Sequence, residues 1–278
     1  MPAYTRSADG TTIAYERHGQ GPPLVLVFGA LSDRQARFAT PGHLLDRDFT
    51  VFTYDRRGRG DSGDATNYSV QKEIDDLAAV IREAVREAGQ AAGTPGSEPG
   101  TKAHLFGHSS GAILALKAAG AGLPIDHLAV YEPPFILDGT RTRPPVDLAR
   151  RLRDLVHEGH RAEALRLDFT EAMQFSPEAI TGIERGPLWA QFLSLAHTLP
   201  YDIEICGPGN YIPMADVAQI TVPTLVIAGE KSPGWMQAGT AELAKKIPGA
   251  RHVTLAGQDH GTRPAALAPV LRDFYLMR

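Results

Sequence analysis

The chain has 278 residues, of which 43% are hydrophobic and 22% are charged, with a formal net charge of −4. This composition is typical of a folded globular protein with one or two domains, and it argues against disorder or fibrous repeats over the whole chain. The slightly acidic charge balance argues against a nucleic-acid-binding protein, and the single cysteine, Cys206, excludes an internal disulfide and a cysteine-built metal site.

The first elements along the chain are predicted to be strands. Short β-prone runs at 3–7 and 11–17 flank an Asp-Gly turn pair, which predicts a hairpin. The run 24–28 is continuously apolar, as is typical of a strand that is covered on both faces in a parallel sheet. A further strand is predicted at 50–54.

A long helix follows, and then a regular alternation of elements. Apolar residues recur at helical spacing over 69–89, which predicts a helix that packs one face on the sheet. The next stretch, 89–101, reads GQAAGTPGSEPGT and is predicted to be a flexible surface linker. Beyond it we expect strands at 103–106, 128–131, 223–228 and 253–256, and helices at 110–119, 238–246 and 264–275. Such alternation indicates βαβ units and a mostly parallel sheet.

Between Pro134 and Val222 the pattern changes to helices alone, interrupted by several prolines. Two apolar stripes at helical spacing, one near Leu152 and one near Leu165, predict helices that pack on each other. We therefore predict two parts: an α/β core formed by residues 1–134 and 221–278, and an α-helical cap formed by residues 135–220.

The strongest chemical signal is the motif G-x-S-x-G, which runs from Gly107 to Gly111 between a predicted strand and a predicted helix. This context is that of a nucleophile elbow, in which a serine occupies a sharp, strained turn and its hydroxyl is exposed at the end of the sheet. Ser109 is therefore the predicted nucleophile. The same turn directs the Ser110 N–H, at the helix start, toward a developing oxyanion.

On this motif and four further segments, the chain resembles the α/β-hydrolase fold superfamily over nearly its whole length. The other segments are LVLVFGA at 24–30, YDRRGRGDS at 54–62, VPTLVI at 222–227 and GQDH at 257–260. The resemblance implies an eight-stranded, mostly parallel sheet flanked by helices, a helical cap, and a Ser-acid-His mechanism without a cofactor. It also implies an oxyanion hole made by the backbone N–H groups of Ala30 and Ser110, with Gly29 as the alternative to Ala30.

The base is predicted to be His260, one of ten histidines. It follows the last strand and precedes the last helix, and an open α/β sheet gathers its site in the loops at the carboxyl ends of its strands. The other nine are expected to be packing or surface residues.

The acid departs from the commonest pattern of the family, because Ser232 stands where an Asp is usual. Glu132 directly follows the strand that neighbours the nucleophile strand in the family's order. Some members, such as the zearalenone-lactone hydrolases, place a glutamate acid there, so this chain is similar to that variant. Glu230 is the alternative acid, and Asp259 is interpreted as a turn residue.

A charged cluster follows the strand at 50–54. It contains Asp55, Arg56 and Asp61. We interpret it as an internal ion-pair brace, because such turns more often stabilise a loop than react with a substrate.

Large apolar residues in and near the cap are expected to roof the pocket. The candidates are Met173, Trp189, Phe192, Tyr201 and Trp235. They predict an apolar small-molecule ester or lactone as the substrate, and no cationic clamp for a charged substrate stands out. One alternative is a different reaction on the same fold: C–C bond hydrolysis, acyl transfer or a cofactor-free cyclase or oxygenase step. The other is a non-catalytic binding protein, and the absence of an Asp at 232 gives weight to this second alternative.

The sequence also suggests where the protein acts. The most apolar stretches, 24–31 and 112–123, are shorter than the roughly 18 residues of a membrane span. The first residues lack the basic-then-apolar pattern of a signal peptide. We therefore expect a cytoplasmic soluble protein with no metal and no membrane partner. Its oligomeric state stays open, a homo-oligomer included.

Overall fold

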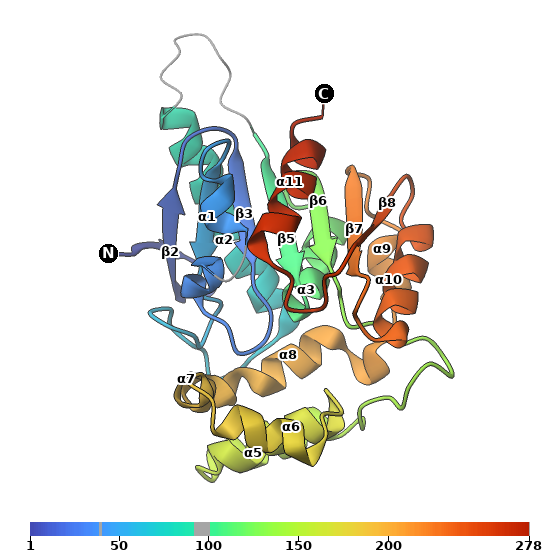
Figure 1. Ribbon diagram of the computed structural model, residues 1–278. Coiled ribbons are helices and arrows are strands. Elements are labelled where there is room, and N and C mark those ends of the chain that lie inside the picture. Colours follow the sequence, from blue (N-terminus) through green and yellow to red (C-terminus); the bar gives the residue numbers. More distant parts are fainter. Residues whose placement is uncertain (39–40, 92–100, 278) are drawn as a thin grey trace.

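The computed structural model describes residues 1–38, 41–91 and 101–277, and its strands form one eight-stranded sheet in the order β1-β2-β4-β3-β5-β6-β7-β8 (Figure 1). The strands are β1 Ala3–Arg6, β2 Thr12–His18, β3 Pro23–Val27, β4 Thr50–Tyr54, β5 Ala103–His108, β6 Ile125–Tyr131, β7 Thr224–Gly229 and β8 Arg251–Leu255. β2 pairs antiparallel with β1 and with β4, and every other neighbouring pair is parallel. The prediction of an eight-stranded, mostly parallel sheet is confirmed.

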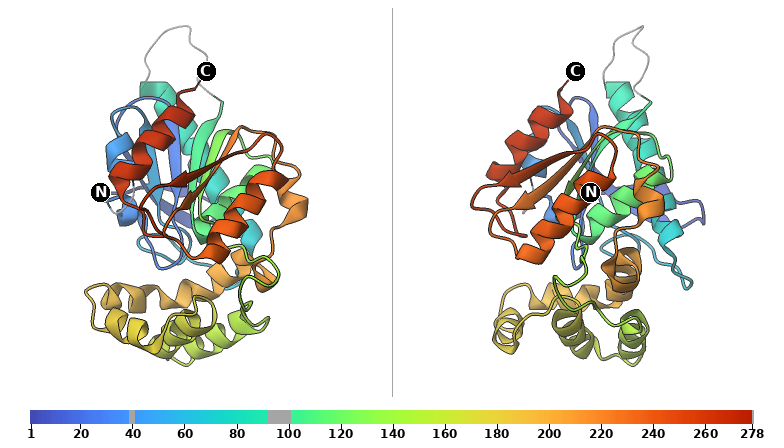
Figure 2. Two further views of the ribbon diagram at one scale, coloured as in Figure 1. Left: turned by 45° about the vertical axis from the view of Figure 1, so that its right-hand side comes forward. Right: turned by 90° about the vertical axis from the view of Figure 1, so that its right-hand side faces the viewer.

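Helices cover both faces of this sheet (Figures 1 and 2). They are α1 Gly42–Leu45, α2 Val70–Ala91, α3 Ser110–Gly120, α9 Met214–Val217, α10 Gly234–Lys246 and α11 Pro264–Tyr275. Side chains alternate across the strands, so Val25 of β3 packs with α2 and α3 whereas its neighbour Leu26 packs with α1 and α11. The central strands are apolar throughout because both of their faces are buried.

The strand order brings the chain to a switch point beside β3. The chain passes from β3 to β4 on one side, and later returns to place β5 on the other side of β3. In open α/β sheets the crevice outside the carboxyl ends of such strands is where ligands bind. The loops after β3 and β5 therefore meet where a site is expected.

The segment between β6 and β7 is helical and lies together at one end of the sheet (Figures 1 and 2). We call the first five of its six α-helices the cap helices: α4 Leu148–His157, α5 Arg161–Glu171, α6 Pro177–Glu184, α7 Trp189–Leu195 and α8 Leu199–Cys206. Leu152 of α4 and Leu165 and Phe169 of α5 belong to an apolar core of their own, separate from the two cores on the sheet. The division at residues 135 and 220 stays a prediction.

Three short 3₁₀ helices complete the elements of the described residues: η1 Arg34–Phe38, η2 Ala196–Thr198 and η3 Pro208–Asn210. Most predicted elements are present with shifted ends. β6 begins three residues earlier than predicted, because a bulge in its pairing with β5 accommodates the polar residues Asp126 and His127. The predicted linker at 89–101 lies mostly outside the described residues, and α2 extends to Ala91. Among the helices of the described ranges, none is long and apolar enough to cross a membrane.

Candidate active site

Ser109 lies in a strained turn between β5 and α3. Its φ is 57° and its ψ is −128°, a conformation that non-glycine residues rarely adopt. The glycines of the motif allow this turn because side chains would not fit. A Cβ on Gly107 would lie 2.6 Å from the Ala112 Cα, and one on Gly111 would lie 2.4 Å from the Val27 carbonyl oxygen. The sequence thus fixes a sharp bend that presents the serine at the end of β5.

The structure brings the three predicted catalytic residues into one hydrogen-bonded chain. The Nε2 atom of His260 lies 3.1 Å from the Ser109 Oγ, and its Nδ1 atom lies 2.8 Å from the Glu132 Oε2. A base in this position can take the proton of the serine hydroxyl while the carboxylate orients the ring and stabilises the imidazolium. The three residues follow three different strands, as predicted, and the fold brings their side chains together.

Glu132 is fully buried, and like Ser109 it has a positive φ, here 46°. Its second oxygen, Oε1, accepts a hydrogen bond of 2.6 Å from the Gly229 N–H at the end of β7. Both carboxylate oxygens are thus satisfied, as a buried charge requires. The unusual backbone conformation turns the side chain toward His260 immediately after β6 ends.

The other carboxylates considered from the sequence lie elsewhere. Glu230 is exposed, and its Oε2 accepts from the Gly257 N–H, so it does not reach the base. Asp259 accepts from the Gly261 N–H within its own turn, as expected of a turn residue. Ser232 is buried, and its hydroxyl has no hydrogen-bond partner in the described part of the chain.

Two side chains hold the loop that carries His260. The Tyr131 hydroxyl donates to the Asp259 carbonyl at 2.5 Å, and the His108 Nε2 donates to the His260 carbonyl at 3.0 Å. Burial, together with the neighbouring His260, lowers the pKa of His108 to about 3, so His108 is a neutral donor at physiological pH. His108 therefore positions the loop, which is more specific than the packing role expected from the sequence.

The predicted oxyanion loop lies directly against the serine. A Cβ on Gly29 would lie 2.8 Å from the Ser109 Cβ, so only glycine fits there. The Arg59 Nη1 donates to the Gly29 carbonyl at 2.7 Å. Because a trans peptide places its C=O and N–H on opposite sides, this bond directs the Ala30 N–H away from Arg59. Ala30 lines the same cavity as Ser109, in agreement with the predicted donor position.

Asp202 of α8 connects the cap helices to this loop. It accepts from Arg56 at 2.8 Å, from Arg59 at 2.7 Å and from the Ser110 hydroxyl at 2.7 Å. Burial by itself would raise the pKa of Asp202, but Arg59 and Arg56 keep it below its ordinary value. One buried carboxylate thus contacts both the elbow and the arginine that orients the oxyanion loop.

The charged turn after β4 is an ion-pair brace, as the sequence analysis proposed. Arg34 pairs with Asp55 and, at 2.6 Å, with Asp61, and Arg56 pairs with Glu73 at 2.7 Å. Arg34 lies far from the turn in sequence and no local pattern marks it, so sequence reasoning missed it. Asp202 was missed for the same reason. Arg59 lies within the quoted turn, but its bond to the Gly29 carbonyl joins two distant segments and no sequence pattern marks it.

A cavity of about 560 Å³ opens above Ser109, within the range of about 300–1,000 Å³ that is usual for small-molecule sites. Its walls come from the core loops and the cap helices. They are formed by Ala30, Ser109, Ser110, Pro134, Arg141, Asp168, Ala172, Met173, Phe175, Asp202, Ile203, Cys206, Asn210, Lys231, Pro233, Trp235, Met236, Asp259, His260 and Gly261. Two of the predicted substrate-binding residues, Met173 and Trp235, are among them.

The other three predicted substrate-binding residues lie away from this cavity. Trp189 and Phe192 of α7 pack against the core of the cap helices. Tyr201 stacks on Tyr68 with ring centroids 3.9 Å apart, and its hydroxyl donates to Asp64. These large side chains pack within the cap helices or against the core domain, and for that reason they do not line the cavity as the sequence predicted.

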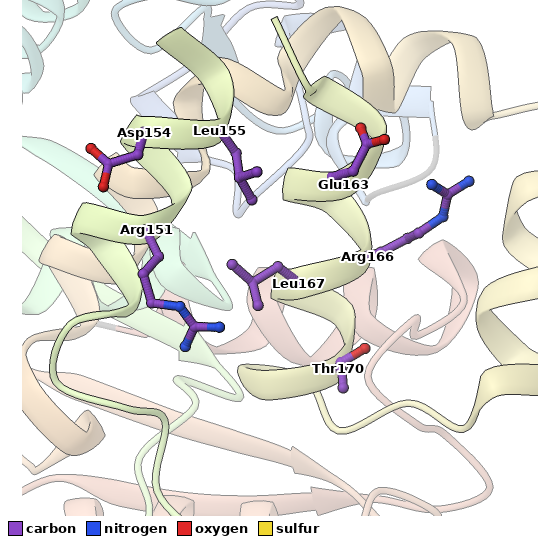
Figure 3. Close-up of a pocket in the computed structure, with 7 residues that line it drawn as sticks. All are labelled: Arg151, Asp154, Leu155, Glu163, Arg166, Leu167 and Thr170. Atoms are coloured by element: carbon purple, nitrogen blue, oxygen red, sulfur yellow. The ribbon is translucent and has the colours of Figure 1, made fainter. Parts of the chain in front are cut away.

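A second hollow, of about 540 Å³, lies on α4 and α5 and contains none of the catalytic candidates (Figure 3). Its two arginines are already paired: Arg151 with Glu171 at 2.6 Å and Arg166 with Glu184 at 2.5 Å. This hollow is a groove between charged helix surfaces, and it carries no chemistry of its own.

One group of described residues has the composition of a metal site: His104, Asp126 and His127, whose ligand atoms lie within 4.8 Å of one another. It lies where β5 and β6 begin, at the opposite end of these strands from Ser109. The Nδ1 atom of His127 is already 2.9 Å from the Asp126 carboxylate, and the His104 ring packs on Tyr275. The group therefore has a structural explanation, and it takes no part in the triad.

Comparison with known proteins adds family information to this geometry. The sequence model of the alpha/beta hydrolase family matches residues 18–270. An alpha/beta hydrolase from Sphaerobacter thermophilus of known structure is 46% identical, with a TM-score of 0.88 over 98% of this chain and 100% of that one. The enol-lactonase from Burkholderia xenovorans has a similar fold, with 21% identity and a TM-score of 0.70 over 99% and 100% of the two chains.

A curated protein described as an uncharacterized hydrolase, YraK of Bacillus subtilis, is 26% identical over 166 residues. This match covers 59% of the present chain and spans 55% of the length of the Bacillus protein. It agrees with the family model, and it adds no information about the substrate.

Proposed function

Because the chain belongs to the alpha/beta hydrolase family, we propose that it is a serine hydrolase that cleaves an ester or a lactone through an acyl-enzyme on Ser109. The observation that carries the proposal is the chain of hydrogen bonds from Glu132 through His260 to Ser109 at the floor of the cavity. Such a constellation is identified by its geometry and by the roles of its members.

In the first half-reaction, the Ser109 Oγ attacks the carbonyl carbon while the Nε2 of His260 takes the hydroxyl proton. The negative charge then forms on the carbonyl oxygen, which the N–H groups of Ala30 and Ser110 stabilise. Loss of one such donor typically costs about 100- to 1,000-fold in rate. The C–O bond to the leaving group breaks, the imidazolium returns its proton to the departing oxygen, and an acyl-enzyme remains.

In the second half-reaction, His260 removes a proton from a water molecule, which attacks the acyl carbon. The bond between Ser109 and the acyl group then breaks, and His260 returns the proton to the serine oxygen. Glu132 stays ionised throughout and stabilises the imidazolium in both steps. For a lactone, the leaving oxygen and the acyl group belong to one molecule, and the product is a hydroxy acid.

A fluorophosphonate probe tests the proposal, because it reacts covalently with activated serines. We expect the wild-type protein to be labelled at Ser109, and we expect labelling to be lost in Ser109→Ala and strongly reduced in His260→Ala. Hydrolysis of para-nitrophenyl esters and of simple lactones should follow the same order. A folded wild-type protein that is not labelled and hydrolyses neither class would refute the proposed function.

A further inference from the structure

Arg141 lies in the wall of the catalytic cavity, and none of the described carboxylates pairs with it. It belongs to the segment between β6 and α4, and it lines the same cavity as Ser109 and His260. No sequence pattern indicates a cationic group there, because Arg141 and Arg143 are two arginines of one polar loop. Only the folded chain separates their environments.

The other buried arginines of the described structure have carboxylate partners. Arg56 pairs with Glu73 and Asp202, and Arg57 pairs with Asp76 at 2.7 Å. For Arg141, by contrast, the structure shows no ion pair within the described residues, and burial lowers the pKa of its guanidinium. A half-buried cation without a counter-charge is costly unless a ligand neutralises it.

The guanidinium is held in place. Its Nη2 donates to the Ala172 carbonyl at 2.8 Å, and its plane lies over the Trp235 ring, with the Cζ 4.3 Å from the ring centroid. A guanidinium fixed in the wall of the cavity matches the planar, two-oxygen geometry of a carboxylate.

The acidic groups of the cavity do not oppose an anion strongly. Asp202 is neutralised by Arg56 and Arg59. Asp168 is fully buried, and burial together with the charge of Asp202 raises its pKa to about 7, so much of it is protonated at neutral pH. The third acid of the wall, Asp259, is exposed and accepts from the Gly261 N–H. The exposed Lys231 adds a second cation beside Arg141. These two cations outnumber the one exposed carboxylate, so the charges at the cavity wall favour a negative ligand.

We infer that Arg141 binds a carboxylate carried by the substrate, at the part of the molecule remote from the ester or lactone carbonyl that Ser109 attacks. This inference rests on the proposed function. It replaces the expectation of a purely apolar substrate with that of an apolar molecule bearing one acidic end. The apolar walls near Met173 and Met236 are available to its hydrocarbon part.

Matched esters test the inference. The mono-para-nitrophenyl esters of succinic, glutaric and adipic acid are compared with the same esters in which an isopropyl group replaces the free carboxylate. We expect the wild-type protein to prefer at least one acid ester. In Arg141→Gln, kcat/KM for that ester should fall by about 10- to 100-fold, which is the usual effect of losing a charge-assisted hydrogen bond.

This loss should be found mainly in KM, because the carboxylate contacts Arg141 equally in the ground state and in the transition state. The isopropyl esters should be hydrolysed by Arg141→Gln as by the wild type. Arg143→Gln is the control, since Arg143 also lies over an aromatic ring, that of Tyr211, but pairs with Asp138 and does not line the cavity. Arg143→Gln should leave kcat/KM unchanged for both the acid esters and the isopropyl esters.

Equal loss for both ester classes in Arg141→Gln would assign Arg141 a structural role between α5 and α10 and would overturn the inference. A wild-type preference for the isopropyl esters throughout would also overturn it.

If the wild type hydrolyses no ester at all, the proposed function fails, and a binding measurement tests the inference separately. In Ser109→Ala, succinate, glutarate or adipate should then raise the melting temperature more than the matching diamide, and adding Arg141→Gln should abolish this difference. An equal effect of acids and diamides would refute carboxylate binding.

Discussion

Replacing Glu132 by glutamine tests the assignment of the acid, because two donors share its carboxylate. Oε1 accepts from the Gly229 N–H at 2.6 Å and Oε2 from the His260 Nδ1 at 2.8 Å. An amide has one oxygen and one NH₂ group, so it cannot accept from both. The backbone N–H of Gly229 cannot change its role, so we expect the amide oxygen to stay there and the NH₂ group to face His260.

His260 must then accept at Nδ1 and carry its proton on Nε2, the atom that lies 3.1 Å from the Ser109 Oγ. In this tautomer the ring cannot take the serine proton. The geometry stays intact, but kcat should fall by about 10,000-fold, the size of effect known for a triad with the wrong tautomer. Stability should change little, since the amide has the shape of the carboxylate and both positions keep a hydrogen bond.

The assay is kcat for a para-nitrophenyl ester, with the melting temperature as the check on folding. Glu230→Gln is the matched control, because Glu230 is exposed and its carboxylate accepts from the Gly257 N–H, away from His260. It should keep full turnover. The reasoning is wrong if Glu132→Gln stays near wild-type activity while Glu230→Gln loses it.

Three further predictions concern the surroundings of the triad. In Gly29→Ala, a Cβ 2.8 Å from the Ser109 Cβ must displace the serine, so kcat should fall about 100-fold while circular dichroism stays unchanged. In Asp202→Asn, the buried Arg59 loses the charge of its carboxylate partner, whereas Arg56 keeps Glu73, and urea unfolding should show a loss of about 3–5 kcal/mol; an unchanged midpoint would contradict this. Asp168 has a pKa of about 7 in the folded protein and an ordinary value of 3.8, so the native state holds its proton longer and wild-type stability falls as pH rises between these values. The gain in unfolding free energy from Asp168→Asn should therefore grow from about pH 4 to pH 7 and then level off, at no more than about 4 kcal/mol; a gain independent of pH would argue against a buried proton on Asp168.

The sequence was most informative where chemistry depends on the backbone. The glycines around Ser109 predict a strained turn because a Cβ at Gly107 or Gly111 would overlap neighbouring atoms. The approach of His260 and Glu132 to Ser109 was expected from their positions after strands, since parallel strands end at the same edge of a sheet, and for Glu132 also from the strand order of the family that the chain resembles. These expectations use local pattern and strand order, and neither depends on the details of packing.

The composition of the cavity wall could not be predicted in the same way. Trp189 and Phe192 have the size and apolarity of pocket residues, but their helix packs them, partly buried, against the core of the cap helices. Arg141 and Arg143 are two residues apart in one loop, and only the first lines the cavity. Which side of a short helix or loop faces a cavity depends on contacts between distant segments, and the pattern of one segment does not contain that information.

The position of Glu132 explains how a carboxylate contacts His260 although residue 232 is a serine. β6 pairs with both β5 and β7, so its end lies between the elbow of Ser109 and the loop in which Ser232 is found. A carboxylate that leaves either β6 or β7 can therefore approach the same imidazole. The loop after β7 still contributes to the acid, because the Gly229 N–H at its start donates to Glu132.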